Sequence, residues 1–146
     1  MGNVIKPHLV NLGLPDMAVQ WLSDLWDVIQ TFDDLVDGDI VGQHELHSLI
    51  MLTLFKMPSN PFFLENSYRL LPALQLAYMK WRASDDLERV GLVDARTFVW
   101  RASYYDVVLA VAVICFGNDI AVSKATQIMT IYGESFEDYV REFDNA

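Results

Sequence analysis

The chain has 146 residues, 53% hydrophobic and 21% charged, so one domain with a large core is expected and a disordered protein is excluded. Its 20 acidic residues outnumber its 10 lysines and arginines and give a net charge of -10. This charge would repel a phosphate backbone, so direct nucleic-acid binding is not expected.

Helix start and stop residues recur along the chain, and no stretch alternates with period two for long, so the predicted fold class is all-α. A first helix begins at Pro15-Asp16 and ends at Gly38, a glycine in the C′ position. A second helix is predicted over 43–56, with Pro58 as its end. A turn and a short helical piece through Glu65 follow.

The next helix allows two interpretations. It either runs from Leu71 to Arg89, with Pro72 in its first turn, or it begins near Asn66, in which case Pro72 should kink it. Both interpretations end this helix before Gly91.

A long helix is predicted over 95–116, with Asp94 as its N-cap and Gly117 at its end. It is apolar on nearly every face, which is typical of the central helix of a bundle. Arg101 and Asp106 interrupt it, and a buried charge must be paired, bound to a metal or shifted in pKa. Asp106 is therefore either a structural carboxylate held by the chain or a functional one.

Two further helices follow, one over 120–132 capped by Asp119 and one capped by Ser135 and reaching about Phe143. Together the elements predict a single compact bundle of five or six helices, forming one helical domain over 1–146.

Cys115 is the only cysteine, so no intrachain disulfide can form. We expect a small buried hydrophobe at this position, in an intracellular, reducing compartment such as the cytoplasm. The apolar run 107–116 around it has ten residues, about half of what a membrane span requires. No membrane span is expected.

The most informative stretch is an aspartate cluster in the first predicted helix. The apolar, buried face of this helix is predicted to comprise Trp21, Leu22, Leu25, Val28, Ile29, Phe32, Leu35 and Val36. Asp33 and Asp37 lie one above the other at the edge of this face, whereas Asp24, Asp27 and Asp34 project toward solvent. Stacked carboxylates repel, and the helix dipole disfavours anions at a C-terminal end. A divalent cation would reverse this repulsion, and oxygen ligands are what Mg²⁺ selects. The alternative is a solvated acidic face.

The string FDDLVDG, from Phe32 to Gly38, resembles the first aspartate-rich motif, DDxxD, of class I isoprenoid synthases, in particular the squalene and phytoene synthase branch. This resemblance implies that Asp33, Asp34 and Asp37 bind Mg²⁺, which holds the diphosphate of a substrate within an all-α fold.

A second resemblance concerns the segment Tyr104–Val111, which is similar to the metal-binding helix of all-α MazG-like nucleotide pyrophosphohydrolases. Asp106 is the residue that matches. Both resemblances imply Mg²⁺ and a diphosphate.

The leading functional hypothesis joins these residues into one site. Asp33, Asp34 and Asp37 would hold Mg²⁺, Asp106 would face them with a catalytic role, and Arg101 would contact the anion of a diphosphate-containing small molecule. Whether such a site catalyses a reaction stays open.

The alternative hypothesis is a non-enzymatic interaction or oligomerisation module of an accessory or viral type. The chain contains four Trp, eight Phe, six Tyr and six Met residues, and an exposed aromatic patch would form an interface with a second copy or a partner protein. In either case the cations of the middle third are expected mainly as counter-ions: Lys80, Arg82, Arg89, Arg96 and Arg101.

Overall fold

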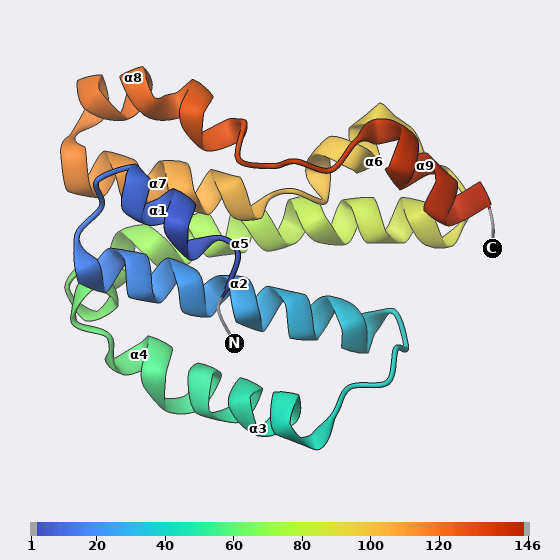
Figure 1. Cartoon of the computed structure of the whole chain (residues 1–146), viewed down its shortest axis with the longest axis horizontal. Coiled ribbons are helices and arrows are strands. Elements are labelled where there is room, and N and C mark those ends of the chain that lie inside the picture. The colour runs from blue at the N-terminus through green and yellow to red at the C-terminus, as the bar shows by residue number, and fades with distance from the viewer. Residues whose placement is uncertain (1–2, 145–146) are drawn as a thin grey trace. The chain divides into compact units, whose positions relative to one another are not determined.

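The computed structural model describes residues 3–144, which are helical and contain no strand (Figure 1). This confirms the all-α fold class. The described residues contain more than the five or six helices predicted, because two expected helices are broken and the short helix α1 (Lys6–Asn11) precedes them. The chain divides into an N-terminal unit, Met1–Ser67, and a C-terminal unit, Tyr68–Ala146. That 1–146 forms a single domain stays a prediction.

The N-terminal unit is built on α2 (Asp16–Val36), which contacts α1 and the segments that follow it in the sequence. Trp21, Leu22 and Leu9 of α1 are at most 1% exposed. The Trp21 ring stacks on Phe63, with 5.7 Å between ring centroids. Burial of such side chains is the main stabilising contribution to the unit. The apolar face predicted for the first half of this helix is therefore confirmed.

The last turns of α2 differ from the prediction. Phe32, Leu35 and Val36 were expected on the buried face, yet each is more than 40% exposed. The helix ends as expected, since Gly38 follows it with a positive φ of 79°. The apolar stripe of α2 therefore continues beyond the core of its unit.

The helix predicted over 43–56 is interrupted by a wider turn and continues past Pro58. It consists of α3 (Gln43–Met51), a π-helical segment η1 (Leu52–Lys56) and α4 (Met57–Ser59). The Met57 N–H donates to the Leu52 carbonyl, five residues earlier. Pro58 has no N–H to donate, and its ring would clash with a carbonyl in a regular α-turn. A π-turn directly before it avoids this clash.

Helix α5 (Pro61–Arg89) begins after Asn60, whose side-chain oxygen accepts from the N–H groups of Phe62 and Phe63. Its backbone leaves the helical region at Asn66, with φ -121° and ψ 15°, rather than at Pro72, which lies inside the helix. The Asn66 side chain donates to the Phe62 carbonyl at 2.9 Å. This side-chain bond competes with the regular backbone bond and accounts for the kink at Asn66.

The predicted continuous helix over 95–116 is wrong, because the chain forms α6 (Ala95–Trp100), a turn, and α7 (Tyr104–Phe116). The buried Ser103 hydroxyl donates to the Ala77 carbonyl of α5 at 2.6 Å. This tertiary hydrogen bond holds the turn in place. No side chain of α7 is exposed, which agrees with its apolar sequence, and Asp94 caps α6 in a capping box with Thr97, as predicted for the N-cap.

The C-terminal unit is completed by α8 (Asn118–Met129), which packs against α7, and by α9 (Phe136–Asp144), which contacts α6. Asp119 was predicted as the N-cap of this helix, but α8 begins one residue before it, at Asn118. The N-cap position is Gly117, with φ 82°, and Asp119 lies inside the first turn. Ser135 does cap α9, because its hydroxyl accepts from the Asp138 N–H at 3.1 Å. Within residues 3–144, no helix has the length and apolar character needed to cross a membrane.

Candidate functional site

The aspartates of the DDxxD-like motif lie at the C-terminal end of α2. Asp33 is half-buried, whereas Asp34 and Asp37 are exposed. The Asp37 N–H donates to the Asp33 carbonyl at 3.0 Å, so these two residues are one helical turn apart, as the sequence predicts. The negative end of the helix dipole lies at the same place and makes the electrostatic environment unfavourable for carboxylates.

In the part of the chain that the structure describes, these aspartates do not form a complete set of metal ligands. Among residues 3–144, no three His, Cys, Asp or Glu side chains come together as a group that could hold a metal ion. Magnesium binding by Asp33, Asp34 and Asp37 therefore stays a prediction.

The burial of Asp24 differs from the prediction made for the aspartate cluster. Asp24 was expected to project toward solvent, but it is 7% exposed and accepts a hydrogen bond from Gln20 at 2.8 Å. Burial raises the pKa of this carboxyl, while the hydrogen bond from Gln20 lowers it. Its spacing from Trp21 and Val28, three and four residues away, places it beside two buried positions and was the sequence signal for its burial.

Asp106 lies in the first turn of α7 and forms an ion pair with Lys80 of α5, at 2.6 Å between Oδ2 and Nζ. This pair lies in the wall of a pocket of about 610 Å³ between α5, α6 and α7. Apart from the pair, the pocket is lined by alanines and larger apolar side chains: Ala73, Leu76, Met79, Ala83, Trp100 and Ala110. Asp106 is thus a paired carboxylate at the edge of an apolar pocket.

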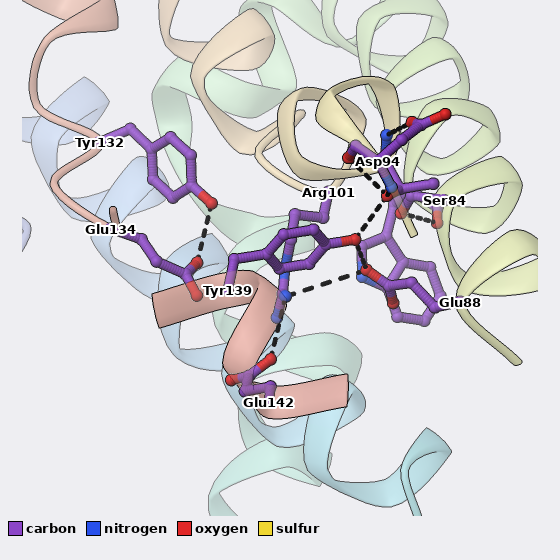
Figure 2. Close-up of polar contacts among 10 residues, drawn as sticks. Ser84, Glu88, Asp94, Arg101, Tyr132, Glu134, Tyr139 and Glu142 are labelled. Atoms are coloured by element: carbon purple, nitrogen blue, oxygen red, sulfur yellow. Dashed lines mark hydrogen bonds and ion pairs between the residues drawn. The ribbon is translucent and has the colours of Figure 1, made fainter. Parts of the chain in front are cut away.

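Arg101 is held by carboxylates of its own unit (Figure 2). Its guanidinium lies 3.2 Å from Glu142 and 3.8 Å from Glu88, and it covers the Tyr139 ring at 4.8 Å. Burial lowers the pKa of Arg101, but the carboxylates of Glu134, Glu88 and Glu142 raise it, and the net result is a raised pKa. The guanidinium is therefore a fixed cation that joins α6 to α5 and α9.

Tyr139 is the buried centre of the same network (Figure 2). Its side chain is fully buried, and its hydroxyl lies 2.7 Å from a Glu88 carboxylate oxygen and 2.6 Å from the Thr97 hydroxyl. Burial raises the pKa of Tyr139 to about 12 and that of Tyr105 to about 12. The pKa of Tyr132 is raised as well, by burial and by the neighbouring Glu134.

Aromatic rings surround this polar centre. Phe98 of α6 contacts the rings of Tyr132, Phe136 and Tyr139, with centroid distances of 5.3 to 5.5 Å. Sequence reasoning identified Arg101 but missed Tyr139 and Glu88 as its neighbours. The available signal was the spacing of Phe136, Tyr139 and Phe143, which is typical of an amphipathic helix that packs through its aromatic face.

The predicted site residues are divided between the two units. Asp33, Asp34 and Asp37 belong to the N-terminal unit, and Arg101 and Asp106 to the C-terminal unit. Within the C-terminal unit, Arg101 contacts glutamates and Asp106 contacts Lys80, so each has its own partner. The expectation that the middle-third cations act as counter-ions is confirmed, since Arg82, Arg89 and Arg96 also pair with nearby aspartates.

The N-terminal unit also exposes large apolar side chains, which we call the exposed apolar set. They are between 37% and 67% exposed and lie on the last turns of α2 and along α3 and η1: Phe32, Leu35, Val36, Leu46, Ile50 and Leu54. Helices α2 and α3 contact each other. Exposed acidic residues Asp37, Asp39 and Glu45 lie between the two groups in the sequence. The end of α2 and the segment from α3 to η1 therefore carry exposed apolar side chains together with negative charge.

No family model, curated protein or solved structure matches the chain.

Proposed function

We propose that the chain is a non-enzymatic helical interaction module whose N-terminal unit binds an amphipathic helix with basic flanks. The observation that carries this proposal is the exposed apolar set on α2, α3 and η1. Helix α3 has no buried residue, so its two leucines and its one isoleucine do not build the core of their own unit. Large apolar side chains exposed in this number are typical of an interaction surface.

The energetics of burial support a docking role for this set. Burying a leucine, isoleucine or phenylalanine side chain contributes about 1.5–3 kcal/mol. Association and side-chain ordering cost several kcal/mol, so a partner must cover more than one or two of these residues to bind. The spacing of Leu46, Ile50 and Leu54 along one helical run suits a partner that is itself helical, with apolar residues at positions i, i+3 or i+4, and i+7.

The negative charge of the N-terminal unit indicates which class of helix would bind. Residues 3–67 contain nine Asp or Glu residues and only two lysines, Lys6 and Lys56. A helix with lysine or arginine beside its apolar stripe would complement this charge and associate faster at low salt. An acidic helix of the same apolar pattern would be repelled. The proposed partner is therefore a basic amphipathic helix.

A labelled synthetic helix of leucine and lysine tests this proposal by fluorescence anisotropy with the full chain. We expect binding that weakens at high salt, and little binding of a scrambled peptide with the same composition but no amphipathic stripe. In the triple variant Leu46→Ser/Ile50→Ser/Leu54→Ser, affinity should fall by roughly tenfold or more, which corresponds to about 1.4 kcal/mol or more.

The matched control replaces three exposed apolar residues of α8 in the other unit, Ile120→Ser/Val122→Ser/Met129→Ser. This variant should bind as the wild type does. The proposal is wrong if the scrambled peptide binds equally well, because binding would then be charge attraction alone. Equal losses in the two triple variants would also contradict it.

The magnesium–diphosphate function predicted from the DDxxD-like string is the second candidate. It is supported by the one-turn spacing of Asp33 and Asp37 at the end of α2. Substitution of these two residues alone is enough to test it.

A further inference from the structure

The C-terminal unit contains a pocket that the proposed interaction function does not use. It is an open groove, since Leu76 and Met79 are 63% and 59% exposed, and Ala73, Ala83 and Ala110 form the small-residue part of its lining. Leu76, Met79 and Trp100 supply the larger apolar contacts. The volume of about 610 Å³ falls in the range of roughly 300–1,000 Å³ that is usual for small-molecule sites.

One polar feature lies in this apolar lining, the ion pair of Lys80 and Asp106. The Lys80 ammonium has three donor hydrogens, and within residues 3–144 Asp106 is the acceptor it meets. Asp106 uses Oδ2 for this bond, which leaves Oδ1 as an acceptor. The side chains are 43% and 33% exposed. A ligand head group placed here would meet a donor and an acceptor side by side.

We infer that this pocket binds a small aliphatic molecule with one neutral polar head group that both accepts and donates a hydrogen bond, such as a primary alcohol or carboxamide. Its chain would contact the alanines, Leu76, Met79 and Trp100. Its head group would accept from Lys80 Nζ and donate to Asp106. A carboxylate head would be attracted by Lys80 and repelled by Asp106, and an ammonium head the reverse, so neither charged head gains enough from the neutral pair to offset the loss of its hydration.

The experiment uses the full chain with labelled methionine and alanine methyl groups, titrated separately with 1-octanol, octanoate and octylammonium. With 1-octanol we expect intermolecular NOEs to the methyl groups of Met79 and Ala110. Octanoate and octylammonium should bind at least roughly tenfold more weakly, as expected when a charged head group loses its hydration without a net gain from a neutral ion pair.

Two variants separate filling of the pocket from recognition of the head group. Ala83→Leu should abolish 1-octanol binding, whereas Val122→Leu on the exposed surface of α8 should leave it unchanged. Lys80→Met/Asp106→Leu should keep an apolar pocket but remove the discrimination among the three molecules. Circular dichroism confirms that each variant is folded.

The outcomes are decisive in either direction. The inference is overturned if 1-octanol gives no NOE to Met79 or Ala110, or if it binds Ala83→Leu as well as the wild type. It is also overturned if the three molecules bind the wild type equally, because the ion pair would then have no role in recognition. Failure of this test leaves the proposal for the N-terminal unit unaffected, since the two involve separate residues.

Discussion

Asp24 lies in surroundings that disfavour its own charge. Burial raises the pKa of this carboxyl, and Asp27 raises it further, while Gln20, Lys56 and Lys6 act in the opposite direction. The pKa of Asp24 in the folded state therefore lies above its value in the unfolded chain, which is near 4. The contribution of protonated Asp24 to the free energy of unfolding is fully present below the unfolded pKa and is lost as pH rises through the folded pKa. Asp24 therefore reduces the stability of the chain at neutral pH.

Asp24→Asn should increase the free energy of unfolding at pH 7 by about 1 kcal/mol or less. The asparagine oxygen can still accept from Gln20, so the substitution removes the buried charge but keeps the contact. The gain should disappear near pH 3, where an aspartate is protonated in both states. Urea unfolding at the two pH values measures this gain, with Asp39→Asn as the control, because Asp39 is exposed and lies outside α2. A loss of stability at pH 7 would show that the charge of Asp24 is needed.

The magnesium hypothesis can be tested by substitution of Asp33 and Asp37. If they hold Mg²⁺ and a diphosphate, ligand at about 100 times its Kd should add roughly 2.7 kcal/mol to the free energy of unfolding. Thermal unfolding of the wild type with Mg²⁺ and pyrophosphate should then shift upward by several degrees. The shift should vanish in Asp33→Asn/Asp37→Asn.

The control for this measurement is Asp27→Asn/Asp39→Asn, which changes the charge equally and should keep the shift. A wild type that is indifferent to both ligands, with a more stable Asp33→Asn/Asp37→Asn variant, would identify the cluster as like-charge repulsion. The magnesium hypothesis would then be abandoned.

At the scale of elements, one buried hydroxyl connects the turn between α6 and α7 to a third helix. Ser103 donates to the Ala77 carbonyl of α5, 26 residues away in the sequence. This bond ties the turn between two helices to a third. Without it, no hydroxyl of the turn would hold it against α5.

Ser103→Ala should lower the free energy of unfolding by about 1 kcal/mol, the usual net contribution of one hydrogen bond. The matched control is Ser123→Ala, because the exposed Ser123 hydroxyl donates within its own helix, to the Ile120 carbonyl at an equal distance of 2.6 Å. This control should change stability by less than about 0.5 kcal/mol. Similar effects of the two substitutions in urea unfolding would contradict the role given to Ser103.

The elements that sequence reasoning predicted well are those determined by neighbours in the chain. The caps at Asp94 and Ser135 and the glycine stop at Gly38 depend on residues within one turn. The division of 95–116 was missed because the partner of Ser103 comes from a distant helix. The π-turn before Pro58 was missed because proline was taken as a helix end, although a helix can also widen to accept it.

At the scale of the whole molecule, the helix start and stop residues predicted the fold class, and composition determines the net charge but not how the charge is distributed. Residues 3–67 carry nine acidic residues and two lysines, whereas eight of the ten cations lie in the C-terminal unit. For the candidate site, the sequence predicted the stacking of Asp33 and Asp37. It could not predict the pairing of Lys80 with Asp106 or of Glu88 with Tyr139, because such pairs form only through tertiary packing.

The tyrosines give the two units different optical properties. All six lie between Tyr68 and Tyr139, in the C-terminal unit, and the pKa of Tyr105 and that of Tyr139 are each raised to about 12. An unfolded tyrosine ionises near pH 10, so this unit loses stability as pH rises from about 10 toward 12. The part of the tyrosinate absorbance that comes from Tyr105 and Tyr139 should therefore appear late and in a cooperative step. In a Trp81→Phe/Trp100→Phe variant, fluorescence reports only Trp21 and Trp26 of the other unit. Coincidence of the two signals in an alkaline titration would show that residues 1–146 unfold as one domain, and two separate transitions would show that they do not.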